Sequence, residues 1–425
     1  MALFDKYRYV VLAVGFFGLF SICANYILVN FNFICMIEDK NDVIILGNGT
    51  LRQRYDYTPQ EKSYIHWGVG IGSIIGTFPI NWAYVRWGAK FPFFIAGVLS
   101  AVATALTPIA AHWGIGAFIF VRLLQGLAFA ADFAAMGMLT VRWAPLSETG
   151  IFLGFLTSFT PVANTIANAG SGIMCSTVGW RAAFYFHAAF TLFIFVVWLL
   201  IYSDDPQTNG GVSPRELELI QRNKTPEHIE RDSFVPYKAI CSNWTIIVIL
   251  GLEIGSVALW TSLSSALHLP IKLVMAFLSD WITRYSETAK MMFFNTLAVG
   301  LVGVCTGLIP LAPAPWMSVA LYVFCHWLAS ANSSGFYKCA ALHARQYAHV
   351  VLATIQFMKC MALFVDEDRA GWTIVFAING IAMIAANCLF YFTASDEAAA
   401  FTSITRKSDG SLVDKSDEKL RTTQL

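Results

Sequence analysis

The sequence is poor in charge. Only 13% of its 425 residues are Asp, Glu, Lys or Arg, whereas 57% are hydrophobic. Soluble domains carry about 25% charged residues and less apolar content, so the composition excludes an ordinary soluble domain and indicates a protein that crosses a membrane several times. The formal net charge is only +1. A nucleic-acid-binding protein needs a basic patch or stripe, so the charge balance argues against nucleic acid as a partner.

The short motifs that mark enzyme sites are also missing. The sequence contains no H-E-x-x-H zinc motif, no P-loop and no G-x-S-x-G nucleophile elbow. Without a Walker motif the chain is not a self-contained ATP-driven pump, so any active transport must be secondary. We therefore expect no enzyme activity, no cofactor and no bound metal.

Cysteines are absent from the polar stretch 37–63, although the chain has nine of them. Most lie within or beside apolar runs, and only Cys241 lies in a polar loop. The sequence thus predicts no extracellular disulfide framework. The first apolar run lacks a small-residue cleavage site, so we expect a retained first span and not a removed signal peptide.

What the sequence does contain is a series of apolar runs of about 20 residues, the length of a helix that crosses a bilayer. They predict an all-α membrane protein with about twelve transmembrane helices in two six-helix halves. The runs lie near 8–36, 64–85, 91–111, 115–140, 150–175, 182–203, 244–261, 263–280, 290–311, 315–337, 346–365 and 371–394. Helices seven, eight and eleven are expected to be short, because residues 243–280 must hold two spans and their turn at about 1.5 Å per residue.

A polar segment divides the chain into these halves. The predicted parts are an N-terminal half (1–203), a cytoplasmic linker (204–243), a C-terminal half (244–394) and a disordered cytoplasmic tail (395–425). Within the linker, Ser213 and Glu216 have the spacing of a capping box, with Pro214 at the first helical position. This pattern predicts a short helix.

Most of the Lys and Arg residues fall in segments that are cytoplasmic if the N-terminus is inside. This positive-inside bias predicts that both termini are cytoplasmic. The plasma membrane and a lysosomal or vesicular membrane both fit such an orientation. Asn48 and Thr50 then form an N-glycosylation sequon in the large outer loop.

Two similar loops occur in equivalent places of the two halves. NWAYVRWGAK (81–90) follows the second span and AFLSDWITRY (276–285) follows the eighth. Both resemble the G-x-L-A-D-R-x-G-R-K loop of the major facilitator superfamily. The first copy keeps Arg86, and the second keeps Asp280 and Arg284. The resemblance implies that these residues act between the halves.

A narrower resemblance follows from RLLQGLAFAADFAAMGMLTVRWAPLSETG (122–150), together with SGIM (171–174) and SDDPQ (203–207). These segments are similar to the anion/phosphate cotransporter branch of that superfamily, which includes sialin, the vesicular glutamate transporters and the type I sodium–phosphate transporters. The resemblance implies a secondary active transporter that moves a small organic anion or inorganic phosphate by alternating access, coupled to H⁺ or Na⁺. We expect it to work in the lipid bilayer as a monomer.

Of four positions that bear on this resemblance, two match the family pattern and two depart from it. Arg122 occupies the fourth-span arginine that helps the family bind its anion, and His66 occupies a histidine found in the vesicular glutamate members. Tyr26 stands where the first span usually has an arginine. Phe129 stands where the family has its proton-linked glutamate.

One face of the fourth span gathers its polar side chains. At 100° per residue, Arg122, Gln125, Phe129 and Asp132 share an arc of about 80°. Arg122 offers a fork of donors suited to an anion, or else caps carbonyls of a neighbouring helix. Asp132, about 15 Å further along the axis, either replaces the missing glutamate as an ion-coupling group or pairs with Arg142. The predicted substrate-binding residues are Arg122, Gln125, His66 and Tyr26.

A second ion-coupling candidate is Glu253, a carboxylate within the seventh span. It either carries a proton or pairs with Lys272 in the eighth span. An alternative function also stands: a membrane protein of transporter fold that has lost transport and acts by binding or partner interaction. Tyr26, Phe129 and the short spans favour this alternative, whereas Arg122 favours transport.

Overall fold

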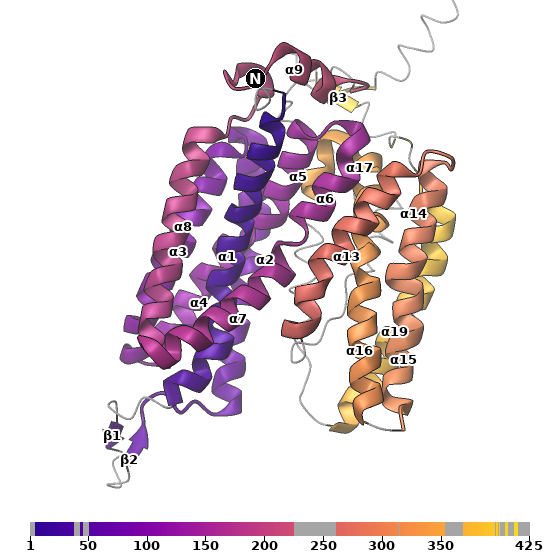
Figure 1. Cartoon of the computed structure of the whole chain (residues 1–425). Helices are drawn as coiled ribbons and strands as arrows, with labels where there is room; N and C mark the ends of the chain where they lie inside the picture. The colour runs from indigo at the N-terminus through magenta and orange to yellow at the C-terminus, as the bar shows by residue number, and fades with distance from the viewer. Residues whose placement is uncertain are drawn as a thin grey trace, which may run out of the picture.

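The computed structural model describes residues 5–37, 43–45, 51–224, 261–313, 315–352, 369–395, 397, 399, 404–406 and 412–414. Two helical bundles stand side by side, one from each half of the chain (Figure 1). Asn48, Glu253, the predicted seventh span and most of the eleventh lie outside the described residues.

The N-terminal bundle contains the first six predicted spans, two of which are divided. Its helices are α1 (Tyr7–Ile37), α2 (Pro59–Trp87), α3 (Lys90–Trp113), α4 (Ile115–Phe129), α5 (Ala131–Trp143), η1 (Leu146–Glu148), α6 (Thr149–Leu156), α7 (Phe159–Thr177) and α8 (Trp180–Ile201). The fourth span is α4 with α5, and the fifth is α6 with α7. A short antiparallel hairpin, β1 (Val43–Ile45) with β2 (Leu51–Gln53), follows α1.

The C-terminal bundle has more divided helices. They are α13 (Thr261–Trp281), α14 (Glu287–Asn295), the π-helical η3 (Thr296–Leu301), α15 (Val302–Leu308), η4 (Ile309–Leu311), α16 (Pro315–Ala329), η5 (Ser330–Ser333), α17 (Phe336–Ala344), η6 (Arg345–Tyr347) and α19 (Arg369–Thr393). The helix at the predicted eighth span, α13, has 21 residues, which span about 31 Å.

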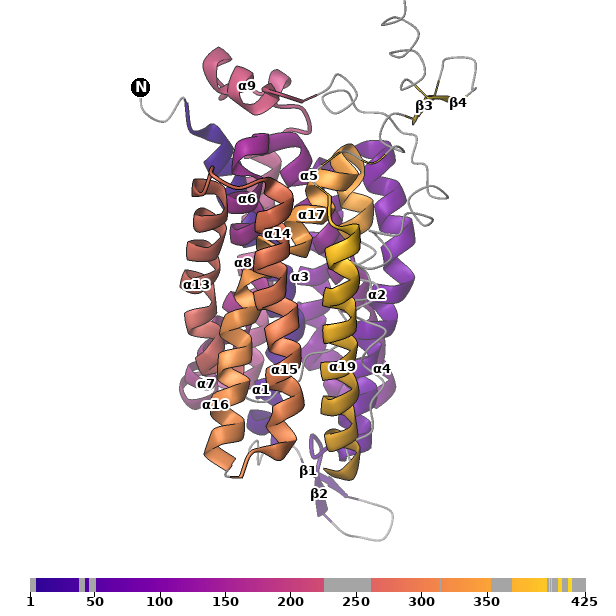
Figure 2. The ribbon, with the colours of Figure 1, turned by 90° about the vertical axis from the view of Figure 1, so that its right-hand side faces the viewer.

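The linker contributes η2 (Pro206–Thr208) and α9 (Pro214–Gln221). In Figures 1 and 2, α9 lies at one end of the bundles and the β1–β2 hairpin at the other. We call these the linker end and the hairpin end. In the segment for which the sequence predicts disorder, β3 (Ile404–Arg406) and β4 (Leu412–Asp414) pair as a second antiparallel hairpin.

Length and composition identify membrane-spanning helices. Among the described residues, six stretches are long and apolar enough to cross a membrane: Tyr7–Ile37, Lys90–Trp113, Ile115–Trp143, Leu146–Thr177, Trp180–Ile201 and Glu287–Leu308. Aromatic and aliphatic side chains on these helices remain exposed, such as Phe120 at 60% and Phe193 at 64%. Exposed apolar faces on long apolar helices are expected of a protein whose solvent is lipid.

Glycines bring α2 and α4 unusually close together. A Cβ atom on Gly72 would meet the backbone carbonyl of Leu123, and one on Gly126 would meet that of Val69. Small residues let helix backbones approach in membranes, where packing drives helix association. The close contact fixes the position of α4, which carries the predicted anion-binding face.

A disulfide joins Cys35 near the end of α1 to Cys175 near the end of α7, so the sequence prediction of no disulfide there was wrong. The two cysteines lie 140 residues apart in sequence, yet their Cα atoms are 6.0 Å apart. Each cysteine lies at the edge of an apolar run. Disulfide frameworks are recognised from the spacing of cysteines in polar loops, so the sequence offered no sign of this pair. Only the packing of α1 on α7 brings the two together.

Candidate functional site

The Arg122 side chain is buried between three helices, with 1% of the residue exposed. Its Nη1 donates to the backbone carbonyl of Tyr26 on α1 at 2.8 Å and to Oε1 of Gln125 at 2.7 Å. Its Nε donates to the carbonyl of Ile65 on α2 at 3.5 Å. The carbonyl contacts that were one of the two predictions for Arg122 are therefore present. Among the described residues no carboxylate pairs with it.

Gln125 belongs to a buried polar network that ties α4 to its neighbours. Its Nε2 donates to Oγ1 of Thr104 at 2.9 Å and to the carbonyl of Asn25 at 3.4 Å. The Asn25 amide in turn donates to Ser100 on α3 and Thr191 on α8. Since both ends of the Gln125 amide are engaged, this side chain orients the guanidinium beside it.

His66 lies on α2, toward the hairpin end from Arg122. It is partly buried and interacts electrostatically with that guanidinium. Its ring stands edge-on to Phe33 of α1, with the ring centroids 5.6 Å apart. Lys62, one turn before it, places Nζ 5.7 Å from the centroid of the same Phe33 ring. The structure thus brings His66 next to the predicted anion-binding arginine.

Tyr26 and Phe129 are in direct contact. Their ring centroids lie 4.5 Å apart with the planes inclined by 52°. Tyr26 is partly exposed, and Phe129 is 9% exposed. At these two positions the resemblance leads one to expect an arginine and a glutamate. The two departures from the family pattern are therefore one feature, an aromatic pair beside Arg122, and the sequence offered no sign that they touch.

Asp132 lies in the first turn of α5 and is completely buried. Neither carboxylate oxygen has a hydrogen-bond partner among the described residues. Its predicted alternative partner, Arg142, lies 3.5 Å from Asp205 instead. A buried ionised carboxylate without partners is costly, so the described contacts leave this side chain unsatisfied.

The loop motif of the second half connects the two bundles. Asp280, near the end of α13, accepts a hydrogen bond from the backbone N–H of Ile151 in the first turn of α6 at 3.0 Å, and one from Lys338 of α17 at 2.6 Å. Arg86 and Arg284 are exposed at the same end. Of the predicted motif, Asp280 makes a direct contact between the halves.

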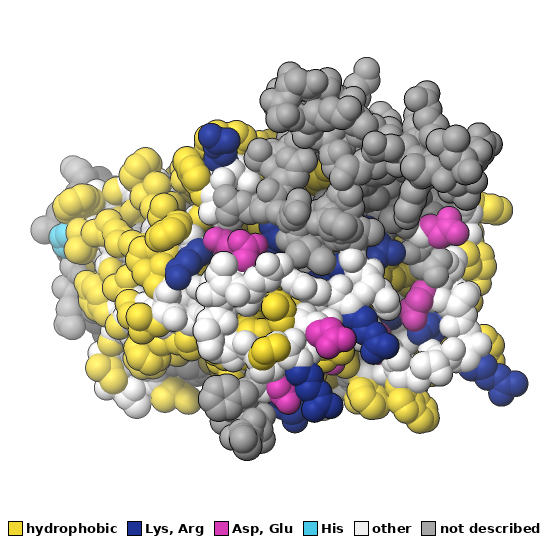
Figure 3. All heavy atoms as spheres, turned by 90° about the horizontal axis from the view of Figure 1, so that it is seen from above, with side chains coloured by type: hydrophobic (Ala, Val, Ile, Leu, Met, Phe, Trp, Pro, Cys, Tyr) yellow, Lys and Arg dark blue, Asp and Glu magenta, His cyan; other side chains and the backbone are white. Residues whose placement is uncertain are grey.

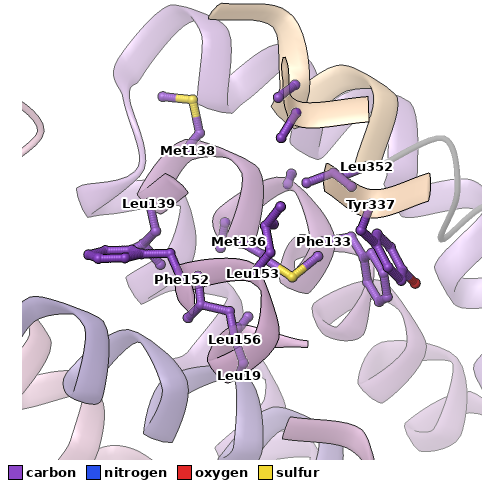
Figure 4. Packing of buried hydrophobic residues seen from close by; sticks show 14 of the residues in the cluster. Leu19, Phe133, Met136, Met138, Leu139, Phe152, Leu153, Leu156, Tyr337 and Leu352 are labelled. Atoms are coloured by element: carbon purple, nitrogen blue, oxygen red, sulfur yellow. The ribbon is translucent and has the colours of Figure 1, made fainter. Parts of the chain in front are cut away.

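Other contacts between the described parts of the two halves lie beside Asp280. Lys272 donates to the carbonyl of Thr157 at 3.3 Å, and a Cβ on Gly154 would lie 2.6 Å from that of Ala276. In Figure 4, Phe133 lies beside Tyr337 from the C-terminal bundle. We call these contacts, together with those of Asp280, the linker-side seam.

A charged cluster that the sequence did not reveal covers that end. The Arg8 guanidinium pairs with Glu148 at 3.0 Å and with Glu216 at 3.2 Å. Glu216 also accepts from the backbone N–H groups of Tyr7 and Arg8. Ser213 caps α9 as predicted, but Glu216 caps α1 and does not complete the predicted capping box. Figure 3 shows basic and acidic side chains intermixed on this end, with hydrophobic side chains at its edges.

Beside this cluster is a small hollow of about 20 Å³, lined by the end of α5 and by the linker. Arg142, Asp205 and Lys224 are among its lining residues. Lys224 Nζ donates to the carbonyl of Val141 at 2.9 Å. Burial, and then the positive charge of Arg142, lower the pKa of Lys224 to about 7.

Comparison with known proteins supports the resemblance that the sequence motifs indicate. Residues 9–365 match the family model of the Major Facilitator Superfamily. Human sialin is 26% identical over 259 residues, which cover 57% of this chain and 52% of sialin. Vesicular glutamate transporter 2 of Bos taurus is 23% identical over 80% of this chain and 66% of its own length. Human sodium-dependent phosphate transport protein 1 is 27% identical over 45% of this chain and 42% of its own length.

Solved structures share the fold. The proton:xylose symporter XylE has a TM-score of 0.65 at 12% identity, covering 92% of this chain and 95% of that one. The human organic anion transporter MFSD10 has a TM-score of 0.58 at 13% identity, covering 91% and 99%. The match to the sialins spans only about half of their length. From the family match over most of its length and the shared fold, the chain belongs to the major facilitator superfamily, a family of multi-pass membrane transporters and not of enzymes.

Proposed function

We propose that this protein is a secondary active transporter that moves a small organic anion or inorganic phosphate by alternating access. The observation that carries the proposal is the buried Arg122 guanidinium, which has no acidic partner among the described residues. A charged group within a membrane helix costs roughly 2.5–3.5 kcal/mol even on lenient scales. Backbone carbonyls offset part of this cost, and an anionic substrate supplies the missing negative charge.

The relatives agree with this choice. Their names include a glutamate transporter and a sodium-dependent phosphate transport protein, both of which act on anions. Arg122 lies within the N-terminal bundle, where it contacts backbone carbonyls of α1 and α2. A substrate that binds there would be reached from opposite sides as the two bundles rock, which is how transporters built from two halves alternate access.

Alternating access requires that the linker-side seam open and close. Asp280 and Lys272 cross it to backbone groups of Ile151 and Thr157. These bonds do not depend on side chains of the opposite half, so they can break and reform as whole helices move. We assign the described conformation to the state closed at the linker end.

The coupling ion is H⁺ or Na⁺. Asp132 is a candidate for its carrier because it is buried and lacks partners among the described residues. Glu253 remains the second candidate, proposed from its place in the sequence.

The disulfide supports an orientation for the protein in the membrane. Disulfides persist in oxidising compartments and are rare in the cytosol, so the hairpin end, which carries Cys35–Cys175, faces the outside or a lumen. The linker end and both termini are then cytoplasmic, as the positive-inside bias predicts. The protein would act, as a monomer, in the plasma membrane or a lysosomal or vesicular membrane.

The test is uptake of labelled phosphate, glutamate, sialic acid and urate into proteoliposomes with an imposed pH or sodium gradient. Uptake of at least one anion is expected, with a large loss in Arg122→Ala and a smaller one in Arg122→Lys, which keeps the charge but not the fork of donors. Phe120→Ala, on the lipid-facing side of the same helix, is the matched control. Absence of uptake of any anion by monodisperse protein would support the alternative, a transporter fold without transport.

A further inference from the structure

The proposed anion site has one wall in the described N-terminal bundle, formed by the Arg122 guanidinium and the rings of Tyr26 and Phe129. Arg122 Nη1 contacts the backbone carbonyl of Tyr26, and the ring of the same Tyr26 lies against Phe129. Phe129 follows Arg122 by two turns on one face of α4, about 10 Å along the axis. A ligand that reaches from the guanidinium along this face therefore meets the aromatic pair next.

The charge on this wall matches a monovalent anion. Arg122 contributes one positive charge, and the Gln125 amide beside it is neutral and already engaged at both ends. An unperturbed imidazole is mostly uncharged at neutral pH, and the Arg122 guanidinium disfavours a second positive charge on His66 beside it. Among the described residues of this wall, no second cation stands ready to pair with a dianion, and unpaired buried charges are strongly unfavourable.

The donor count also argues against phosphate. The hydrogen bonds described for the guanidinium already occupy Nε and Nη1 with carbonyl and amide oxygens. A carboxylate needs few donors, whereas a phosphate presents more acceptor oxygens than the described wall of this site can satisfy. Tyr26 and Phe129 add contact surface for an apolar ring, and aromatic contacts of this kind change affinity by about two- to tenfold each.

We propose that the substrate is a monovalent organic anion with an apolar, ring-sized body, such as an aromatic monocarboxylate. Its carboxylate meets Arg122 and its ring rests on Tyr26 and Phe129, while dicarboxylates and inorganic phosphate bind poorly. The inference rests on the proposed function, and narrows its substrate class.

The test is calorimetric titration of the purified full-length protein in detergent with phenylacetate, acetate, glutarate and inorganic phosphate at pH 7.4 and equal ionic strength. Phenylacetate is expected to bind at least tenfold more tightly than acetate, glutarate or phosphate. Tyr26→Leu and Phe129→Leu, which keep apolar volume, should each narrow the preference for phenylacetate over acetate by about two- to tenfold. Phe120→Leu, on the lipid-facing side of α4, should leave that preference unchanged.

A second variant tests the charge argument by gain of binding. Tyr26→Arg adds a positive charge beside Arg122, and should raise the affinity for glutarate relative to phenylacetate by about tenfold or more. If phosphate or glutarate binds the unmodified protein as tightly as phenylacetate and loses binding in Arg122→Ala, the inference is overturned and the proposed function stands. If monodisperse protein binds none of the four anions, the proposed function fails and the inference with it.

Discussion

Replacing Asp280 with Asn should loosen the linker-side seam. The Asp280 carboxylate accepts the Ile151 backbone N–H at the start of α6 and the Lys338 ammonium at 2.6 Å, and the residue Lys338 is only 3% exposed. Asn keeps the shape but loses the charge. Hydrogen bonds to charged groups contribute about 1.5–3 kcal/mol and neutral ones about 0.5–1.5 kcal/mol. The closed state should therefore lose about 1 kcal/mol, which corresponds to a shift of about fivefold in the equilibrium between closed and open.

Maleimide labelling of a cysteine within the seam measures this shift. Ala276 faces Gly154 across the seam and is 1% exposed, so Ala276→Cys reports its opening. In the Asp280→Asn background its labelling rate should rise by about fivefold, with the modified peptide identified by mass spectrometry. Glu287→Gln is the matched control, because Glu287 pairs with Lys290 and Lys338 within the C-terminal bundle alone. Equal labelling rates with and without Asp280→Asn would refute the assignment of this contact as a lock between the halves.

Three further changes have defined outcomes. Gly72→Val should cost about 3 kcal/mol by overpacking α2 on the α4 backbone and lower the thermal unfolding temperature, whereas Gly116→Val, where a Cβ meets nothing within 4 Å, should not. Cys35→Ser should cost about 2–4 kcal/mol by removing the disulfide; Cys388→Ser, at a free exposed thiol, is the control, and equal melting temperatures would contradict the disulfide. The pKa of Lys224 in the folded protein is about 7, below its ordinary value of 10.5, so the unfolded chain binds more protons and stability should rise with pH between about 7 and 10.5; Lys224→Met should flatten that rise in melts recorded across this pH range.

The sequence by itself determined that the protein is a multi-pass membrane protein and which face of the fourth span carries its polar side chains. Hydropathy is a local property, so apolar runs predicted helices that the structure describes, and six described stretches are long and apolar enough to cross a membrane. Helical periodicity is local as well, and it placed Arg122 and Gln125 on one face before any contact was known. The linker helix and its Ser213 cap followed from the same kind of local pattern.

Tertiary structure alone decided which distant groups meet. Cys35 forms a disulfide with Cys175, the ring of Tyr26 contacts that of Phe129, and Asp280 accepts a hydrogen bond from the first turn of α6. In each case more than a hundred residues of chain separate the two groups. No periodicity in a single sequence encodes such pairs, because their proximity depends on how whole helices pack. For the same reason the sequence predicted that Glu216 caps the helix it belongs to, whereas in the packed structure its carboxylate accepts hydrogen bonds from the first backbone N–H groups of α1. The sequence thus placed the arginine, and the fold brings two backbone carbonyls and the Gln125 amide to it, with no paired carboxylate among the described residues.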